Sequence, residues 1–361
     1  MTESLKDLEE EVSNADEPAQ VPPGDIVAYN ELRSCADLYR MHTQKILELH
    51  PEFQREIVWK GPAQTRFVDS LIKQLPIPSM CFAMDHKAQR WIVIDGLQRI
   101  STIVKFLAGG DWTLSELDDV EPEIAGKSVA AIKTATDSLH AYYTRVENLS
   151  IPITVLRCNF DKRSHMNYLF TIFHRLNTGG VKLNNQEIRN CIYGGALNNL
   201  LKELDQVSDW RQLNKMEDGN SYRFTKQEII LRMLALFDRS AGYQGNLAGF
   251  LNDYMQDFRN PDSAFIDEKR LLFTRTVSCI QHRVFNDDPP TLSLTVLEAL
   301  LYGVAKNIDD LEQTTGNEPK ERFDKMLSHA EFSESALREG LAKKPRVISR
   351  LTTAEHIFAG N

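Results

Sequence analysis

The sequence predicts an α+β protein in which a mixed segment of strands and helices precedes an all-helical segment. Three observations lead to this prediction. Short apolar runs bounded by turns occur between residues 46 and 157, helical periodicity recurs along the chain, and strand patterns fade after about Gly195. With 361 residues, the chain is long enough for two domains.

We expect three parts along the chain: an acidic, disordered tail at residues 1–24, an α/β domain at 25–200 and a helical domain at 201–361. The tail lacks periodicity, and its first 20 residues contribute -6 of the formal net charge of -9. The remaining body carries only -3, so the composition indicates no excess of the basic surface that non-specific duplex binding requires. The composition does not exclude a local basic patch that binds nucleic acid.

Each element of the α/β domain has its own signal. Alternation predicts strands at residues 46–49, 80–84, 90–94 and 151–157, and helical spacing predicts helices at 62–75, 100–107 and 164–176. Asn184 and Glu187 have the spacing of a capping box, which predicts another helix start. Further helices are expected at Lys226–Phe237, Leu271–Val284 and Ser293–Ile308.

The cysteines and histidines argue against a metal or disulfide framework. Five cysteines are far apart and never form a CxxC pair, which suits a reducing cytoplasm. The nine histidines show no metal spacing, so we expect no metal site and no nuclease centre. No apolar run reaches the roughly 18 residues of a membrane span, and the acidic start is unlike a signal peptide. We therefore expect a cytoplasmic protein with no membrane partner.

The sharpest motif runs from Trp91 to Thr102, where an apolar strand leads through a glycine into a helix start. Such a turn leaves backbone N–H groups free for an anion. Gly96 permits close approach of a ligand, and Arg99 adds a guanidinium suited to phosphate. The motif's polar candidates are Asp95, Gln98, Arg99, Ser101 and Thr102. Alternatively, Asp95 only caps the helix and Arg99 forms a structural ion pair.

Two further segments carry candidate ligand contacts. Near the end of the first strand, Gln54 could contact a base or ribose, and Arg55 could contact a phosphate. A glycine turn follows the helix that ends near residue 176, and its candidates are Arg175, Asn177, Thr178, Glu187 and Arg189. The alternatives are a surface ion pair for Arg55, and capping or salt-bridge roles for Glu187 and Arg189.

The three motifs in this order resemble the GmrSD N-terminal domain family over roughly residues 40–195. That family is placed on the ParB/sulfiredoxin-like fold, so the resemblance implies that fold for the α/β domain. It also implies nucleotide binding, with NTP hydrolysis in some members, through the Asp95–Arg99 segment. The family's first glutamine in this segment is Leu97 here, which removes any amide contact from that position.

The resemblance implies a nucleoside triphosphate-binding regulatory protein of a bacterial restriction or phage-defence system. Weak NTPase activity stays open, with Asp95, Gln98 and Arg99 as the catalytic candidates and Mg²⁺ arriving with the nucleotide. DNA or a nuclease partner protein are the other partners it implies. The alternative is a non-hydrolysing DNA- or protein-binding module on the same fold. We expect Arg55, Arg99 and Asn177 to line one pocket, and we expect Arg99 to face solvent with few core contacts.

Overall fold

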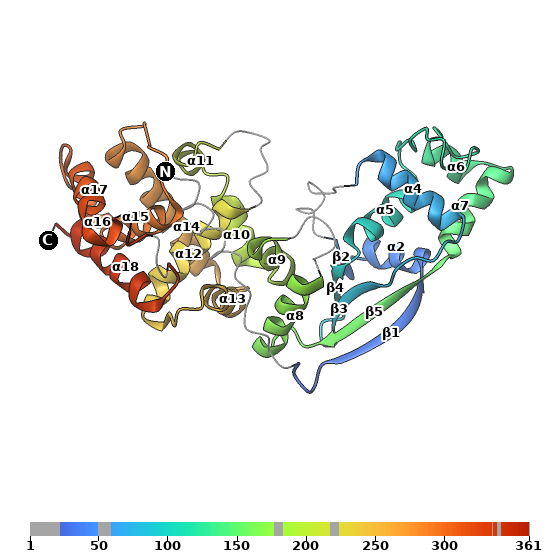
Figure 1. The fold of residues 1–361 in the computed structure, drawn as a ribbon, viewed down its shortest axis with the longest axis horizontal. Coiled ribbons are helices and arrows are strands. Elements are labelled where there is room, and N and C mark those ends of the chain that lie inside the picture. The colour runs from blue at the N-terminus through green and yellow to red at the C-terminus, as the bar shows by residue number, and fades with distance from the viewer. Residues whose placement is uncertain are drawn as a thin grey trace. The chain divides into compact units, whose positions relative to one another are not determined.

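A computed structural model describes residues 22–49, 59–176, 183–216, 224–333, 335–337 and 341–360 of the chain. The chain divides into two compact units between Lys182 and Leu183. We call residues 22–176 the sheet unit and residues 183–360 the helical unit. The expected α+β class, with a helical C-terminal region, is confirmed (Figure 1).

The sheet unit is built on a five-stranded mixed sheet in the order β1-β5-β3-β4-β2. β1 pairs antiparallel with β5, β5 parallel with β3, β3 antiparallel with β4, and β4 parallel with β2. The strands are β1 (Val27–Ser34), β2 (Leu47–Glu48), β3 (Met80–Asp85), β4 (Arg90–Asp95) and β5 (Ser150–Cys158).

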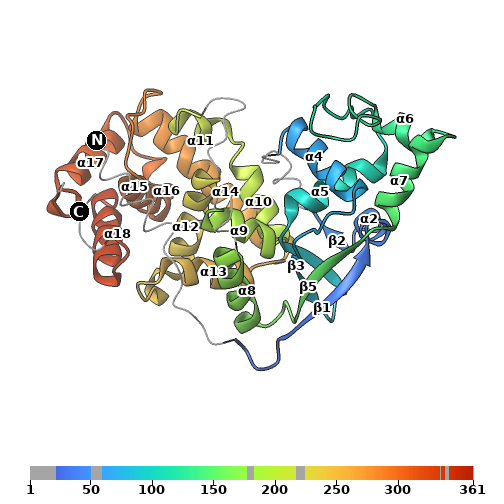
Figure 2. The same ribbon diagram turned by 45° about the vertical axis from the view of Figure 1, so that its right-hand side comes forward.

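Helices cover one face of this sheet, as Figures 1 and 2 show. Alternate strand residues such as Phe82, Val93 and Ile153 point into an apolar core that these helices complete. The other face is packed against α8 at β4, where Ile92 and Ile94 are buried. The covering helices are α2 (Cys35–Thr43), α4 (Gly61–Ile72), α5 (Leu97–Ala108), α6 (Val129–Thr134) and α7 (Ser138–Asn148), and α8 spans Arg163–Leu176.

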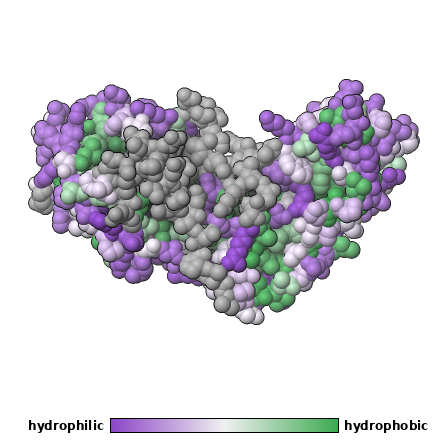
Figure 3. Space-filling model, viewed as in Figure 1, coloured by the Kyte–Doolittle hydropathy of each residue, from purple (hydrophilic) through white to green (hydrophobic). Residues whose placement is uncertain are grey.

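The expected elements of the sheet unit are present within a few residues of their predicted ends, but β1 was not expected. β1 is an edge strand with polar residues on both faces, so it shows no clear apolar alternation. Glu31 and Arg33 pair with each other on its inner face, while Leu32 on its outer face is 71% exposed. Figure 3 shows apolar surface over this part of the sheet.

The helical unit contains every described element after α8, and none of them is a strand. α12 and α15 are its central helices, and each is buried along almost its whole length. The long helices are α9 (Asn185–Ile192), α10 (Ala196–Leu204), α12 (Thr225–Arg239), α13 (Leu247–Asp257), α14 (Ser263–Cys279), α15 (Leu294–Lys306), α17 (Glu318–Ser328) and α18 (Lys344–Phe358). Shorter ones are α11 (Ser208–Leu213), η1 (Ser240–Gly242), η2 (Ile280–Val284), α16 (Ile308–Leu311) and η3 (Ala330–Phe332).

The division between the units lies before the boundary that we expected near residue 200. The reason is the packing of α9, which contacts α12 and α13 of the helical unit. The capping box at its start is confirmed, since Glu187 N–H donates to Asn184 Oδ1 at 2.9 Å and Asn184 N–H donates to Glu187 Oε2 at 2.6 Å.

Candidate functional site

Gly96 makes the turn between β4 and α5. Its φ of 96° lies in the left-handed region, and a Cβ atom there would stand 2.5 Å from Cγ of Met80. Both features select glycine. The first bond of the helix runs from Ile100 N–H to the Gly96 carbonyl at 2.9 Å. The N–H groups in the first turn of any α-helix point away from the helix with no carbonyl four residues before them, so this helix start has the geometry of an anion site.

Arg99 is anchored beside this helix start. Its Nη2 donates to Asp95 Oδ2 at 2.7 Å, and its Nη1 donates to the carbonyl of Pro78 at the entrance to β3. Only 15% of the Arg99 side chain is exposed. The expectation that Arg99 faces solvent with few contacts is therefore wrong, because the guanidinium links the end of β4 to the residues just before β3.

The other polar residues of the motif differ in exposure. Thr102 is fully buried, and its hydroxyl donates to the Gln98 carbonyl at 2.7 Å, so it stabilises the first turn of α5. Ser101 is half-buried. The Gln98 side-chain oxygen accepts a long hydrogen bond of 3.4 Å from the N–H of Trp59.

This last bond shows where the second motif is attached to the sheet unit. Before the motif, β2 runs parallel to β4, with Glu48 opposite Ile92. After it, Trp59 meets Gln98 at the start of α5. The motif residues themselves, Gln54 and Arg55, lie outside the described residues.

The third motif is only partly described. Arg175 is exposed in the last turn of α8. Asn177 and Thr178 lie outside the described residues. The convergence of Arg55, Arg99 and Asn177 in one pocket therefore stays a prediction.

Glu187 and Arg189 have structural roles in the helical unit. Both are buried, with exposed fractions of 0% and 1%. Glu187 closes the capping box. Arg189 donates to Glu228 and to Asn252, each at 2.8 Å. The alternatives that the sequence left open, a cap and a salt bridge, are thus present in the structure.

A row of polar residues crosses the sheet beside Asp95. Cys81 is paired with Thr154, and Thr154 with Asn30, so these three lie on the face opposite the helical core. Asp95 is the partner of Cys81 on β4, next to an irregularity in the register of β3 and β4. The Thr154 hydroxyl donates to Asn30 Oδ1 at 2.9 Å and lies 3.2 Å from the hydroxyl of Ser79. We call Asn30, Thr154 and Ser79 the transverse row. It continues from the Arg99 anchor across β3 and β5 to β1.

Our sequence reasoning missed the transverse row. Thr154 is the only hydroxyl residue in the run Ile151–Arg157, and this is the one signal that could have pointed to it. Burial raises the pKa of the Cys81 thiol to about 12, with a smaller contribution from the Asp95 carboxylate. Cys81 is therefore a neutral, unreactive member of this face.

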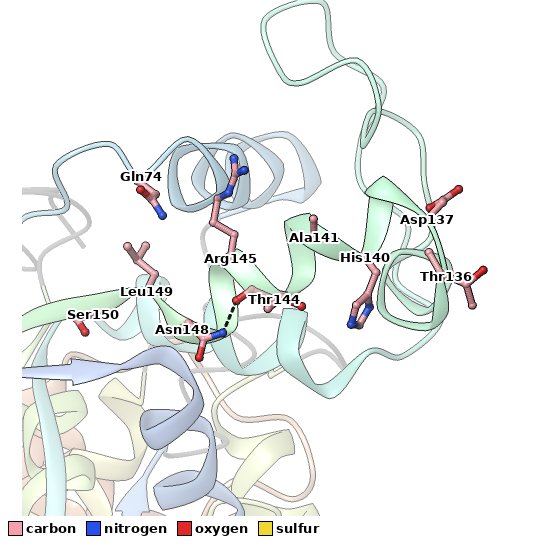
Figure 4. A pocket seen from close by; sticks show the side chains of 11 residues that line it. Gln74, Thr136, Asp137, His140, Ala141, Thr144, Arg145, Asn148, Leu149 and Ser150 are labelled. Atoms are coloured by element: carbon pink, nitrogen blue, oxygen red, sulfur yellow. Dashed lines mark hydrogen bonds between the residues drawn. The ribbon is translucent and has the colours of Figure 1, made fainter.

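A large cavity lies elsewhere on the sheet unit, along one face of α7 (Figure 4). Its volume is about 720 Å³, and none of the predicted site residues lines it. Two of its polar side chains bond to the protein itself: His140 meets the Lys133 carbonyl at 2.9 Å, and Asn148 donates to the Thr144 carbonyl at 2.9 Å. The open, solvent-facing side chains in Figure 4 converge on no single point, so the cavity has less to offer a specific ligand than the start of α5.

A family model described as the GmrSD restriction endonuclease, N-terminal domain, matches residues 35–194. The matched segment begins with α2 and includes the Asp95–Arg99 motif, and it confirms the resemblance read from the three motifs. Neither the curated proteins nor the solved structures provide a match to the chain. In the described part of the chain, no helix is long and apolar enough to cross a membrane.

Proposed function

We propose that the start of α5 binds the phosphates of a nucleoside triphosphate, since the family model of the GmrSD restriction endonuclease N-terminal domain matches residues 35–194, which include this helix start. The family implies a component of a restriction or phage-defence system. Within such a system, the chain would act as a nucleotide-binding regulator and would depend on a partner for nuclease activity. One observation carries the proposal: the left-handed glycine turn at Gly96 starts α5 directly beside an arginine that Asp95 holds in place.

The anchoring of Arg99 is compatible with a phosphate ligand. A guanidinium has five N–H donors, and the bonds to Asp95 and Pro78 engage its two terminal nitrogens. The guanidinium has further N–H donors that can bond to a phosphate. Because the side chain is already held in place, little rotamer entropy would be lost when the phosphate binds. The hydroxyls and the amide of the transverse row are the polar groups that a ribose or base would meet next.

Magnesium would arrive with the nucleotide. Within the described residues, no group of three histidine, cysteine, aspartate or glutamate side chains could hold a metal. Asp95 is the carboxylate nearest the phosphates in this proposal. One carboxylate plus phosphate oxygens and water is an ordinary magnesium environment. Hydrolysis would then depend on Asp95 and Gln98, and binding on Arg99 and the helix start.

The test is a titration of the purified full chain with ATP, GTP, CTP and UTP, with and without Mg²⁺ and DNA, by isothermal calorimetry. Arg99→Ala should weaken binding about tenfold or more, because charge-assisted bonds are worth roughly 1.5–3 kcal/mol. The matched control is Arg66→Ala, which removes an exposed arginine paired with Asp119 on the same unit. It should leave affinity unchanged.

Parallel melts separate binding from folding. Arg99→Ala should also lower the melting temperature, since its anchor to Asp95 and Pro78 is lost. Asp95→Ala should reduce any hydrolysis more than binding if the carboxylate acts on metal or water. If folded Arg99→Ala binds every nucleotide as the wild type does, the assigned role of Arg99 is refuted. No nucleotide binding by the wild type, together with DNA or protein binding, would favour the non-hydrolysing module.

A further inference from the structure

Arginine and glutamate side chains alternate in a chain of ion pairs in the core of the helical unit. Arg189 meets Glu228 at 2.8 Å, Glu228 meets Arg232 at 2.6 Å, and Arg232 meets Glu298 at 3.4 Å. At most 9% of any of these side chains is exposed. They join α9, α12 and α15, which Figure 1 shows in the helical unit. Buried charges of this kind are tolerated only when each has a partner of opposite sign.

Arg350 of α18 adds one more cation to this cluster. It is 3% exposed, and its Nη2 donates to the Leu341 carbonyl at 2.7 Å. Its Nη1 is buried and has no hydrogen-bond partner within the described residues. Burial lowers the pKa of Arg350, and the carboxylates of Glu298 and Glu331 oppose that shift. An arginine nevertheless stays charged in a protein.

The two described carboxylates near this third arginine each have another arginine partner. Glu298 is already paired with Arg232. Glu331 lies 3.9 Å from Arg346, a partly exposed neighbour of Arg350 on α18. Among the described residues, this buried cluster contains three arginines and two glutamates, so Arg350 has no carboxylate of its own there.

A small cavity lies at this point, and its volume is about 20 Å³. Its polar lining is Arg232, Glu298, Arg350, Thr295 and Tyr243, and its apolar lining is Leu236, Leu247, Leu294, Leu341, Ala342 and Val347. A space of roughly 10–15 Å³ on this measure holds one water-sized particle. The cavity therefore suits a single small occupant.

We propose that this cavity binds one small monovalent anion of the halide class, with chloride as the physiological ion. The anion accepts a hydrogen bond from Arg350 Nη1. Negative and positive charges then alternate in the order Glu298, Arg350, anion. A water molecule would satisfy the donor but would bring no negative charge to the buried guanidinium. Apolar walls next to a guanidinium suit a halide, which gives up its hydration more readily than a carboxylate. The site joins α12, α15 and α18, so chloride would stabilise the helical unit.

The first test is thermal unfolding of the full chain in sodium chloride and in sodium gluconate at equal ionic strength. Gluconate is too large for the cavity, so the melting temperature should rise with chloride, following the linkage between ligand binding and stability. Arg350→Met should lose this dependence. Arg346→Met removes a neighbouring arginine that is 41% exposed, and it should keep the dependence.

The second test needs no variant. Crystals of the wild-type protein soaked in bromide should show an anomalous peak within hydrogen-bond distance of Arg350 Nη1. Bromide there, with a chloride-dependent melting temperature, would establish the site even if Arg350→Met does not fold. A wild type that melts equally in chloride and gluconate would overturn the proposal. So would a cavity with density for water and no bromide peak.

Discussion

The buried carboxylate of Asp205 should lower the free energy of unfolding of the helical unit at neutral pH. This side chain at the end of α10 is 3% exposed, and its Oδ1 accepts a 3.3 Å hydrogen bond from Trp210. Burial raises the pKa of Asp205 from 3.8 to about 6, against the smaller opposing effect of that bond. A shift of this size corresponds to about 3 kcal/mol of destabilisation above pH 6, because the folded state holds the charged form less well than the unfolded state.

The sign follows from proton binding. Between pH 4 and 6, the folded state keeps the Asp205 proton more often than the unfolded state. Its contribution to stability therefore improves as the pH falls through that window, by roughly 1.4 kcal/mol per unit, and is constant at higher pH. Asp205→Asn removes the charge and keeps an acceptor for Trp210. The variant should be more stable than the wild type at pH 7.5, and the gain should shrink towards pH 4.

The assay is urea unfolding at pH 4.5, 6 and 7.5, monitored by circular dichroism and by tryptophan fluorescence. Trp210 is the one tryptophan in residues 183–361, so it supplies the part of the fluorescence that comes from the helical unit, and Trp59, Trp91 and Trp112 supply the rest. Asp324→Asn is the control, since Asp324 is exposed on α17. A difference between wild type and Asp205→Asn that is the same at all three pH values would refute the reasoning.

Two further predictions concern backbone strain and buried charge. Gly96→Ala forces a side chain into a left-handed turn against Met80 and should cost roughly 1–3 kcal/mol in a thermal melt, whereas Gly110→Ala, which meets nothing within 4 Å, should cost much less. Glu228→Gln removes the charge shared by two buried arginines and should cost about 3–5 kcal/mol in urea unfolding. Glu203→Gln, which breaks an exposed pair on the same unit, should cost less than about 1 kcal/mol. Equal losses in either pair of variants would contradict the account.

Much of the fold could be predicted because local patterns and tertiary packing agree. The helix α4 and the strands β3 and β4 have apolar residues at the spacing that their buried faces require. The capping box of α9 is local, so three residues of sequence separation sufficed to predict it. β1 was not predicted, because Glu31 and Arg33 pair on its inner face and the strand therefore lacks the alternation of apolar and polar residues.

The candidate site was harder to predict, because it depends on contacts between residues that are far apart in the sequence. The turn at Gly96 follows from the residues beside it, and so does the ion pair of Arg99 with Asp95. The transverse row depends on sheet register that brings Asn30 beside Thr154, 124 residues away. The burial of Arg189 likewise depends on Glu228, which lies 39 residues further along the chain. Neither separation leaves a local pattern in the sequence.

The position of a bound nucleotide decides whether the start of α5 is the phosphate site. The measurement is a crystal structure of the full chain with Mg²⁺ and the nucleotide that binds most tightly in the titration. We expect phosphate oxygens within hydrogen-bond distance of backbone N–H groups in the first turn of α5, with the Arg99 guanidinium beside them. A nucleotide bound along α7, or phosphates that leave the start of α5 untouched, would contradict it.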